Sequence, residues 1–203
     1  MIKIIDYGLG NILAFQNMYK RLNVAVGLAR TVDDLQGATK LILPGVGAFD
    51  HAMEQLDRSG MRQRLDELVL GEKLPVIGIC VGMQMLADRS DEGQLAGLGW
   101  IPGEVRGFKS LGQPDLLLPH MGWNDVSPQP GHRLFNELQS DARFYFLHSF
   151  YFECKEASHV AAVSHYGKEF SCAVSAGNIH GVQFHPEKSH HFGAQLLKNF
   201  AEL

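Results

Sequence analysis

The sequence predicts an α/β fold, in which a single domain of residues 1–203 holds a central mixed, mostly parallel sheet flanked by helices. In the first half of the chain, short apolar segments alternate with longer amphipathic ones, which is typical of parallel strands joined by helices. After about Asp88, Gly and Pro residues separate short strand-like segments, so we expect antiparallel strands to complete the sheet. No linker-like or repeated segment divides the chain.

In the first half, each predicted strand is followed by a helical segment. The first strand leads through a Gly-rich turn to Asn11, a residue type that often N-caps a helix. The longest helical segment is interrupted near Ser59-Gly60, because glycine is a poor helix former. In chain order we expect strand 3–6, helix 12–22, strand 24–28, a helical turn at 32–35, strand 41–43, helix 48–70 and strand 76–80.

The second half is predicted to be richer in strands. A run of aromatic residues precedes two apolar segments that form a hairpin turning at Gly167. Ser189 is placed to cap a final helix, on which Phe192, Leu196 and Phe200 follow helical spacing. The expected strands cover residues 143–151, 160–164, 170–174 and 179–184.

Composition argues against several classes of protein. The net charge is -4 and no basic block occurs, so we expect no nucleic-acid partner. No apolar run approaches membrane-spanning length, and the first residues lack the pattern of a signal peptide. The three cysteines, Cys80, Cys154 and Cys172, lack C-x-x-C spacing, which favours a reducing cytoplasm. His190 and His191 face apart, so we also expect no metal site.

The segment 75–84 organises the rest of the chain. A β-branched run before Cys80 predicts a buried strand, and the helix formers Met83, Met85, Leu86 and Ala87 follow it. Gly78 and Gly82 flank Cys80 in the pattern of a nucleophile elbow, with cysteine in place of serine. Glycine leaves room for such a tight turn. We expect the turn to place the sulfur at a helix N-terminus, which favours the thiolate, and to aim the Val81 N–H at an oxyanion.

A second polar motif, His185-Pro186-Glu187, ends the last predicted strand. His185 and Glu187 are two residues apart, so in an extended segment both side chains project to the same side. Pro186 stiffens the spacer. A carboxylate on one imidazole nitrogen fixes the tautomer and leaves the other nitrogen free to act on a thiol. Together with Cys80 on another strand, the motif predicts a Cys-His-Glu triad.

Each motif also has a simpler interpretation. Cys80 alone is equally well explained as a structural cysteine in a tight turn, and a His beside a Glu at a strand end is usually surface chemistry. Outside catalysis, the chain is also consistent with a binding module or with a redox sensor that uses Cys80. The presence of both motifs favours the enzyme, and trapping of Cys80 by a substrate-like electrophile would discriminate.

Together the motifs resemble the class I, triad-type glutamine amidotransferases, a family with a flavodoxin-like fold. Residues 78–84 resemble the family's G-x-C-x-G-x-Q, residues 181–187 its G-x-Q-F-H-P-E, and residues 44–47 its glycine-rich oxyanion strand. The resemblance implies that Cys80 attacks the side-chain amide of L-glutamine and that water hydrolyses the resulting thioester to glutamate. His185 would move the protons, and no cofactor is implied.

The same resemblance assigns roles to further residues. It implies that the backbone N–H groups of Val81 and Val46 bind the oxyanion. It also implies that Gln84 contacts the substrate, and that the backbone around Ser149 and Phe150 reads the α-amino and α-carboxyl groups of glutamine.

Within the family, the chain is most similar to a branch of glutaminase subunits that act in histidine biosynthesis. The likeness is carried by residues 6–11, 44–49, 119–124, 144–151 and 187–189. It implies a heterodimer with a (β/α)8-barrel cyclase subunit, which receives the ammonia. The alternative is the glutaminase subunit of a synthase of the pyridoxal phosphate or anthranilate type. The cluster at 119–124 argues against this alternative.

Four further residues of the second half are candidates for a partner surface or for the core. His120, Trp123 and Asn124 are candidates for the partner-facing surface, because tryptophan is enriched at interface hot spots. Buried packing is the competing explanation for this cluster. His148 lies inside an apolar run, so we expect a core histidine whose nitrogens are hydrogen-bonded.

Overall fold

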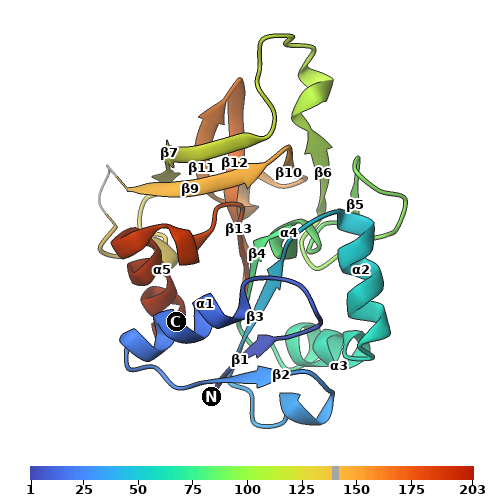
Figure 1. Cartoon of the computed structure of the whole chain (residues 1–203), viewed down its shortest axis with the longest axis vertical. Coiled ribbons are helices and arrows are strands. Elements are labelled where there is room, and N and C mark those ends of the chain that lie inside the picture. Colours follow the sequence, from blue (N-terminus) through green and yellow to red (C-terminus); the bar gives the residue numbers. More distant parts are fainter. Residues whose placement is uncertain (139–141) are drawn as a thin grey trace.

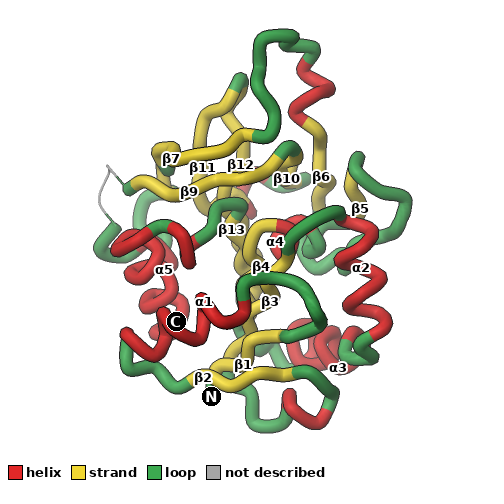
Figure 2. The backbone as a smooth tube through the Cα atoms, viewed as in Figure 1, coloured by secondary structure: helices red, strands yellow, loops and turns green. Residues whose placement is uncertain are grey.

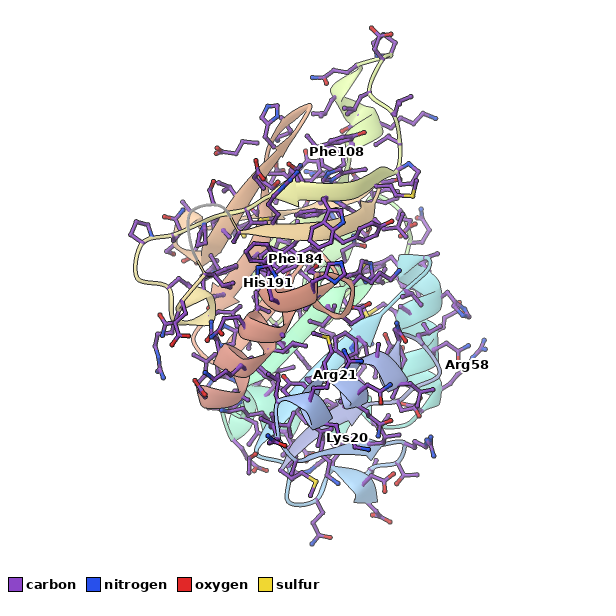
Figure 3. All side chains as sticks on the ribbon, turned by 60° about the vertical axis from the view of Figure 1, so that its left-hand side comes forward. Lys20, Arg21, Arg58, Phe108, Phe184 and His191 are labelled. Carbon is purple, nitrogen blue, oxygen red and sulfur yellow. The ribbon has the colours of Figure 1, made fainter. Side chains whose placement is uncertain are left out.

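The computed structural model describes residues 1–138 and 142–203. Figure 1 shows a lower part in which helices surround the strands and an upper part built mainly of strands and loops, a contrast that the colours of Figure 2 make plain. Buried apolar side chains form one cluster through both parts. Of the buried phenylalanines, Phe108 lies in the upper part and Phe184 near the middle (Figure 3). The predicted α/β fold with a mixed central sheet is confirmed.

The lower part of the sheet is parallel. Its strands lie in the order β2-β1-β3-β4-β13, and every neighbouring pair is parallel. Their bounds are β1 Ile2–Ile5, β2 Val26–Ala29, β3 Lys40–Gly45, β4 Val76–Cys80 and β13 Ile179–Val182. β4 is buried along its whole length, as its apolar run predicted. All five strands lie where the sequence predicted them, with ends shifted by a residue or two.

Helices cover both faces of the parallel strands. α1 (Ile12–Arg21) contacts α5 (His190–Glu202) on one face, and α2 (Phe49–Arg58) and α3 (Arg62–Asp66) lie on the other (Figure 1). The strand order therefore reverses direction between β1 and β3, and ligands of such sheets bind beyond the carboxyl ends of the strands near that point. Among the described residues, no helix has the length and apolarity needed to cross a membrane.

The long helix predicted at 48–70 is interrupted where the sequence indicated. α2 ends before Gly60, whose φ of +70° glycine adopts far more readily than other residues, and α3 then begins. A π-helical turn, Glu67–Gly71, continues α3. Short 3-10 turns lie at Asp33–Leu35 (η1), Phe108–Leu111 (η3), Arg133–Phe135 (η4), Ala157–His159 (η5) and Pro186–Lys188 (η6).

Further strands extend the sheet beyond β13 in the order β12-β10-β6-β5, with β11 paired to β12 and β8 to β11. These pairs are antiparallel except for β5 and β6. The bounds are β5 Arg89–Ser90, β6 Gly103–Gly107, β8 Ser127–Pro128, β10 Phe150–Cys154, β11 Val160–Tyr166 and β12 Lys168–Ala176. β11 and β12 are the predicted hairpin, with Gly167 at its turn.

The single strand predicted at 143–151 is wrong, because the chain changes sheets at Ser149. β9 (Arg143–His148) pairs with β7 (His120–Asp125) in a separate two-stranded sheet, whereas β10 pairs with β6 and β12 in the main sheet. An aromatic run indicates extended backbone but does not show which neighbour each half will pair with. The bend at Ser149 brings this part of the chain over the end of β4.

Asn11 and Ser189 both stand at N-cap positions, but neither side chain bonds to the N–H groups of its helix. The predicted capping role is therefore wrong for both. The Ser189 hydroxyl instead donates to the His185 carbonyl at 2.6 Å and accepts from the Tyr145 N–H at 3.0 Å. These bonds tie the His185 segment to β9.

Candidate active site

The predicted elbow is present at the end of β4. Cys80 adopts φ +56° and ψ -113° and leads into the short helix α4 (Val81–Gln84). Such a φ in a residue other than glycine costs roughly 1–3 kcal/mol and is concentrated at functional sites. Both glycines are needed for steric reasons, because a Cβ on Gly78 would lie 2.5 Å from the Gly82 carbonyl oxygen, and a Cβ on Gly82 would collide with the Leu43 carbonyl.

The helix that follows Cys80 is shorter than predicted. α4 ends at Gln84, and the residues up to Ala87 form turns in which the N–H of Ala87 bonds to the Gln84 carbonyl. Fewer aligned peptide units make a weaker helix dipole at Cys80 than the sequence indicated. The side-chain partners of Cys80 therefore contribute a larger share of the electrostatic interactions at its sulfur.

A cavity of about 280 Å³ opens beside Cys80, at the carboxyl ends of the parallel strands. Several separate parts of the chain line it, and three of them carry predicted residues in addition to His185. The segment after β3 contributes Val46 and Gly47, the elbow contributes Cys80, Val81 and Gln84, and the bend between β9 and β10 contributes Leu147, His148, Ser149 and Phe150. The structure therefore brings the predicted nucleophile, both oxyanion candidates and the three substrate-binding candidates into one cavity.

His185 and Glu187 form a buried pair behind Cys80. His185 Nδ1 lies 2.9 Å from Glu187 Oε1, and the side chains are only 5% and 2% exposed. Burial lowers the pKa of His185, but the interactions of its ring with Cys80 and Glu187 outweigh that effect and raise the pKa above its ordinary value. With Nδ1 held by the carboxylate, Nε2 is left to serve the thiol. This arrangement stabilises an imidazolium within the site.

Two glutamines connect Cys80 to the β9–β10 bend. Gln84 Nε2 donates to the Phe150 carbonyl at 3.4 Å and to Gln183 Oε1 at 3.1 Å, and Gln183 Nε2 lies 3.8 Å from Cys80 Sγ. The thiol itself lies 3.9 Å from the Leu147 carbonyl oxygen. Because both N–H groups of the Gln84 amide are engaged, its oxygen is the atom that remains to accept a hydrogen bond from a ligand.

A chain of hydrogen bonds runs from the cavity wall to β7. His148 Nδ1 lies 2.7 Å from the Phe150 carbonyl oxygen, His148 Nε2 lies 2.9 Å from His120 Nδ1, and His120 Nε2 lies 3.2 Å from Asn124 Nδ2. Since a carbonyl only accepts, both imidazoles can be neutral and every nitrogen is satisfied. Burial lowers the pKa of His148 to about 3 and that of His120 to about 4. The prediction of a satisfied core histidine at position 148 is confirmed, although the residue also faces the cavity.

Glu92 is a cavity residue that the sequence interpretation missed. Its Oε2 accepts a hydrogen bond of 2.9 Å from the N–H of Phe49, at the start of α2. In the sequence, Glu92 is one of several charged residues in a loop, and no spacing or motif singles it out. Its place in the site depends on how the loop after β5 packs against α2.

The three candidates for the partner surface do not share one environment. Trp123 is 40% exposed and its ring stacks on His190, with the centroids 5.3 Å apart. Asn124 is half-buried. His120 is buried between the rings of Tyr166 and Phe146, so the structure does not place it on a surface that a partner could touch.

Within residues 1–138 and 142–203, no group of three His, Cys, Asp or Glu side chains is arranged to hold a metal ion. The cysteines in this part of the chain are all free thiols.

Residues 3–203 match the family described as "Glutamine amidotransferase class-I". The chain belongs to this family. The amidotransferase is 63% identical over 204 residues to the "Imidazole glycerol phosphate synthase subunit HisH" of Bdellovibrio bacteriovorus, and 50% identical to the protein of the same name from Leptospira interrogans, with both chains fully covered in each case. A solved structure described as a glutamine amidotransferase shares its fold, with a TM-score of 0.76 and 20% identity over 99% of this chain and 97% of the other. The amidotransferase is thus a glutamine-hydrolysing enzyme by family.

Proposed function

We propose that this amidotransferase is the glutaminase subunit of an imidazole glycerol phosphate synthase. It hydrolyses glutamine in the cytoplasm and passes ammonia to a (β/α)8-barrel cyclase subunit, its partner in a heterodimer of histidine biosynthesis. The names of the relatives at 63% and 50% identity support this role over a synthase of the pyridoxal phosphate or anthranilate type. The observation that carries the chemistry is the presence of Cys80 and His185 in one cavity, with the Glu187 carboxylate hydrogen-bonded to the His185 ring.

In the proposed reaction, Cys80 Sγ attacks the side-chain carbonyl carbon of glutamine while His185 takes the thiol proton. Negative charge then develops on the carbonyl oxygen, where the N–H groups of Val81 and Val46 are proposed to stabilise it. Collapse of this intermediate breaks the C–N bond, and the proton held by His185 leaves with the ammonia. Glu187 stabilises the imidazolium in the meantime. Water then attacks the thioester with His185 as base, which releases glutamate and restores the thiol.

The rest of the cavity is suited to the polar end of an amino acid. We infer that the Gln84 oxygen and the Glu92 carboxylate receive the α-ammonium group, because both present acceptors there and Glu92 adds negative charge. The backbone at Ser149 and Phe150 would bind the α-carboxylate. In a Glu92→Gln variant, which keeps an acceptor for the Phe49 N–H, the KM for glutamine should rise roughly tenfold. An unchanged KM would remove Glu92 from the substrate site.

The proposed docking surface is the outer face of the β7–β9 sheet. Met121 lies opposite Leu147 and Trp123 opposite Tyr145 in this sheet, and Met121, Trp123 and Leu147 are exposed apolar side chains. Apolar side chains gathered on one small sheet favour a protein partner. The same strand β9 leads directly to the cavity at Leu147, so a partner bound here would lie close to the site where ammonia is released.

Cys80→Ser tests the chemistry. Glutamine hydrolysis should fall to less than about a hundredth of the wild-type rate, because a hydroxyl is a much poorer nucleophile than a thiol here. The cyclase subunit should still turn over with added ammonia, since that step needs no cysteine. Cys154→Ser is the matched control, because Cys154 is partly buried in β10 and does not line the cavity. Hydrolysis that persists in Cys80→Ser would rule out the nucleophile.

Trp123→Ala tests the surface. It should weaken binding of the cyclase subunit by tenfold or more, as expected for a tryptophan hot spot at about 2 kcal/mol, and leave the Tm of the free subunit nearly unchanged. Leu70→Ala is the control, because Leu70 is 44% exposed and lies in the turn before β4, at the amino end of the strand whose carboxyl end carries Cys80. A large loss of Tm with unchanged binding would show that Trp123 is a packing residue instead.

A further inference from the structure

The phenol of Tyr7 reaches from the end of β1 to the strand that leads into the cavity. Tyr7 is buried, and its hydroxyl donates to the Pro44 carbonyl oxygen at 2.7 Å. Burial raises the pKa of Tyr7 well above its ordinary value, and negative charge at nearby Cys80 adds to the rise, so the hydroxyl stays protonated as a donor. The residue therefore joins two segments that are 37 positions apart in the chain.

Pro44 and Gly45 are held on several sides. A Cβ on Gly10 would lie 2.6 Å from the Pro44 Cβ, so the loop after β1 packs directly against the proline ring. Gly45 pairs with Cys80 in the register of β3 and β4, and a Cβ on Gly45 would collide with the backbone N of Gly82. The backbone is thus wedged between the loop after β1 and the first turn of α4.

This constraint ends immediately after Gly45. Val46 is 39% exposed, and the space around Gly47, which has φ +87°, is open. The Tyr7–Pro44 hydrogen bond therefore holds the peptide plane that immediately precedes the one carrying the Val46 N–H, one of the two groups proposed to bind the oxyanion. That N–H belongs to the Gly45–Val46 peptide. Its direction follows from the Pro44–Gly45 plane through the backbone angles of Gly45, which are restricted by the packing of Gly45 against Gly82 and its pairing with Cys80.

We propose that Tyr7 is a positioning residue for the oxyanion hole, because its hydroxyl holds the Pro44 carbonyl and so sets the direction of the Val46 N–H. This inference rests on the proposed function, which assigns the oxyanion to Val46 and Val81. Tyr7 does not line the cavity and therefore does not bind the substrate. The oxyanion forms only as the carbonyl carbon becomes tetrahedral, so losing the anchor should lower kcat and leave KM nearly unchanged.

Tyr7→Phe removes the hydroxyl and keeps the ring. With the cyclase subunit present, kcat for glutamine should fall by about tenfold to a hundredfold, while KM changes less than twofold. This fall in kcat should not exceed the fall caused by removing one oxyanion donor entirely. Tyr19→Phe is the matched control, because Tyr19 is also buried and its hydroxyl donates to the Leu197 carbonyl at 3.1 Å, away from the cavity. Tyr19→Phe loses one buried hydrogen bond, and Tyr7→Phe loses the bond to Pro44 together with a longer contact of the hydroxyl with Met85 Sδ at 3.4 Å. Both variants should lose a similar amount of Tm, but only Tyr7→Phe should lose kcat.

Alkylation of Cys80 by iodoacetamide separates positioning from a direct effect on the nucleophile. That reaction displaces iodide from a saturated carbon and forms no oxyanion, so its rate and pH profile in Tyr7→Phe should match wild type. Slower alkylation in step with kcat would overturn the proposal, as would a kcat equal to that of Tyr19→Phe. Failure of the proposed function would look different, since wild type itself would then show no glutamine hydrolysis that depends on Cys80.

A double variant tests the route through Val46. Val46→Pro removes the N–H that Tyr7 is proposed to aim. Tyr7→Phe should therefore reduce kcat by no more than about twofold further in the Val46→Pro background, because interactions that act through one group are not additive. A full tenfold or greater additional loss would show that Tyr7 acts elsewhere and would overturn the proposal.

Discussion

His185 and His148 both line the cavity beside Cys80 and both are almost wholly buried, but their neighbours shift their pKa values in opposite directions. His185 Nδ1 meets the Glu187 carboxylate, whereas His148 Nδ1 meets the neutral Phe150 carbonyl. The second nitrogen faces the Cys80 thiol in one case and the His120 ring in the other. Burial alone would keep both rings neutral, so the carboxylate and the thiol decide which ring can carry a proton.

The charge of one ring also acts on the other. A proton on His185 lowers the pKa of His148, in addition to the larger effect of burial. His148 therefore stays neutral, as a donor to Phe150 and an acceptor from His120. In the proposed function, His185 transfers protons and His148 positions the Phe150 carbonyl, and the partners of each ring account for the difference. Four experiments test this difference, in order of expected effect.

His185→Ala should have the largest effect. Removing the base that takes the Cys80 proton should lower the rate of glutamine hydrolysis roughly 10²- to 10⁴-fold, measured as glutamate release with the cyclase subunit present. The cyclase reaction with added ammonia serves as the control for folding and assembly, and it should be unaffected. A residual rate within tenfold of wild type would mean that another group takes the proton and that the two histidines do not differ in this way.

Glu187→Gln should cost less than His185→Ala, roughly tenfold to a hundredfold. The amide oxygen can still accept from Nδ1, but it offers no negative charge to the imidazolium. Its NH₂ would replace Oε2, which has no hydrogen-bond partner among the described residues. The pKa of His185, followed by NMR of the ring proton, should fall. If the variant retained full activity with an unchanged His185 titration, the carboxylate would not be what separates the two histidines.

His148→Phe should have a moderate effect, on binding. The Phe150 carbonyl would lose its hydrogen bond from Nδ1, and we expect the KM for glutamine to rise about fivefold, the equivalent of one hydrogen bond, with kcat nearly unchanged. His148→Asn should recover part of the loss, because the Asn amide can reach the position of Nδ1. A fall in kcat as large as that of His185→Ala would contradict the assignment of His148 to positioning.

The acid dependence of stability should show the smallest effect. His120, His148 and His180 have pKa values lowered to about 4, 3 and 4 by burial, so below about pH 6.5 the unfolded chain binds protons that the folded chain does not. Stability should therefore fall as the pH drops from 6.5 toward 4. His185, with a raised pKa, is protonated in the folded state throughout this range and in the unfolded state below about pH 6.5, so it contributes no loss there.

His180→Asn isolates this effect from the cavity, because His180 lies on β13 beside Ser175 and does not line the site. Between pH 7 and pH 5 the wild-type Tm should fall by several degrees, and the variant should fall by about a third less. Glutamine hydrolysis at pH 7 should be unchanged. An identical pH dependence in the two proteins would show that His180 is not held neutral in the folded state.

The elements that sequence patterns predicted well are those set by local constraints. The glycines around Cys80 are required because the elbow leaves no room for a Cβ, and a requirement of this kind is visible in a handful of adjacent residues. The pairing of His185 with Glu187 likewise needs only two-residue spacing beside a proline. The parallel strands were predictable because each is a short apolar run between helical segments.

The remaining features depend on which distant segments meet, and no local pattern encodes that. The division of the aromatic run at Ser149 follows from the pairing of β9 with β7 and of β10 with β6. Glu92 enters the cavity through contacts with α2, and Tyr7 reaches Pro44 only when β1 and β3 are neighbours. The sequence by itself thus determined the family and the fold class and predicted the reactive groups, because steric and spacing requirements act between near neighbours. Only the tertiary structure decided what surrounds those groups, because strand pairing and loop packing join residues that are tens of positions apart.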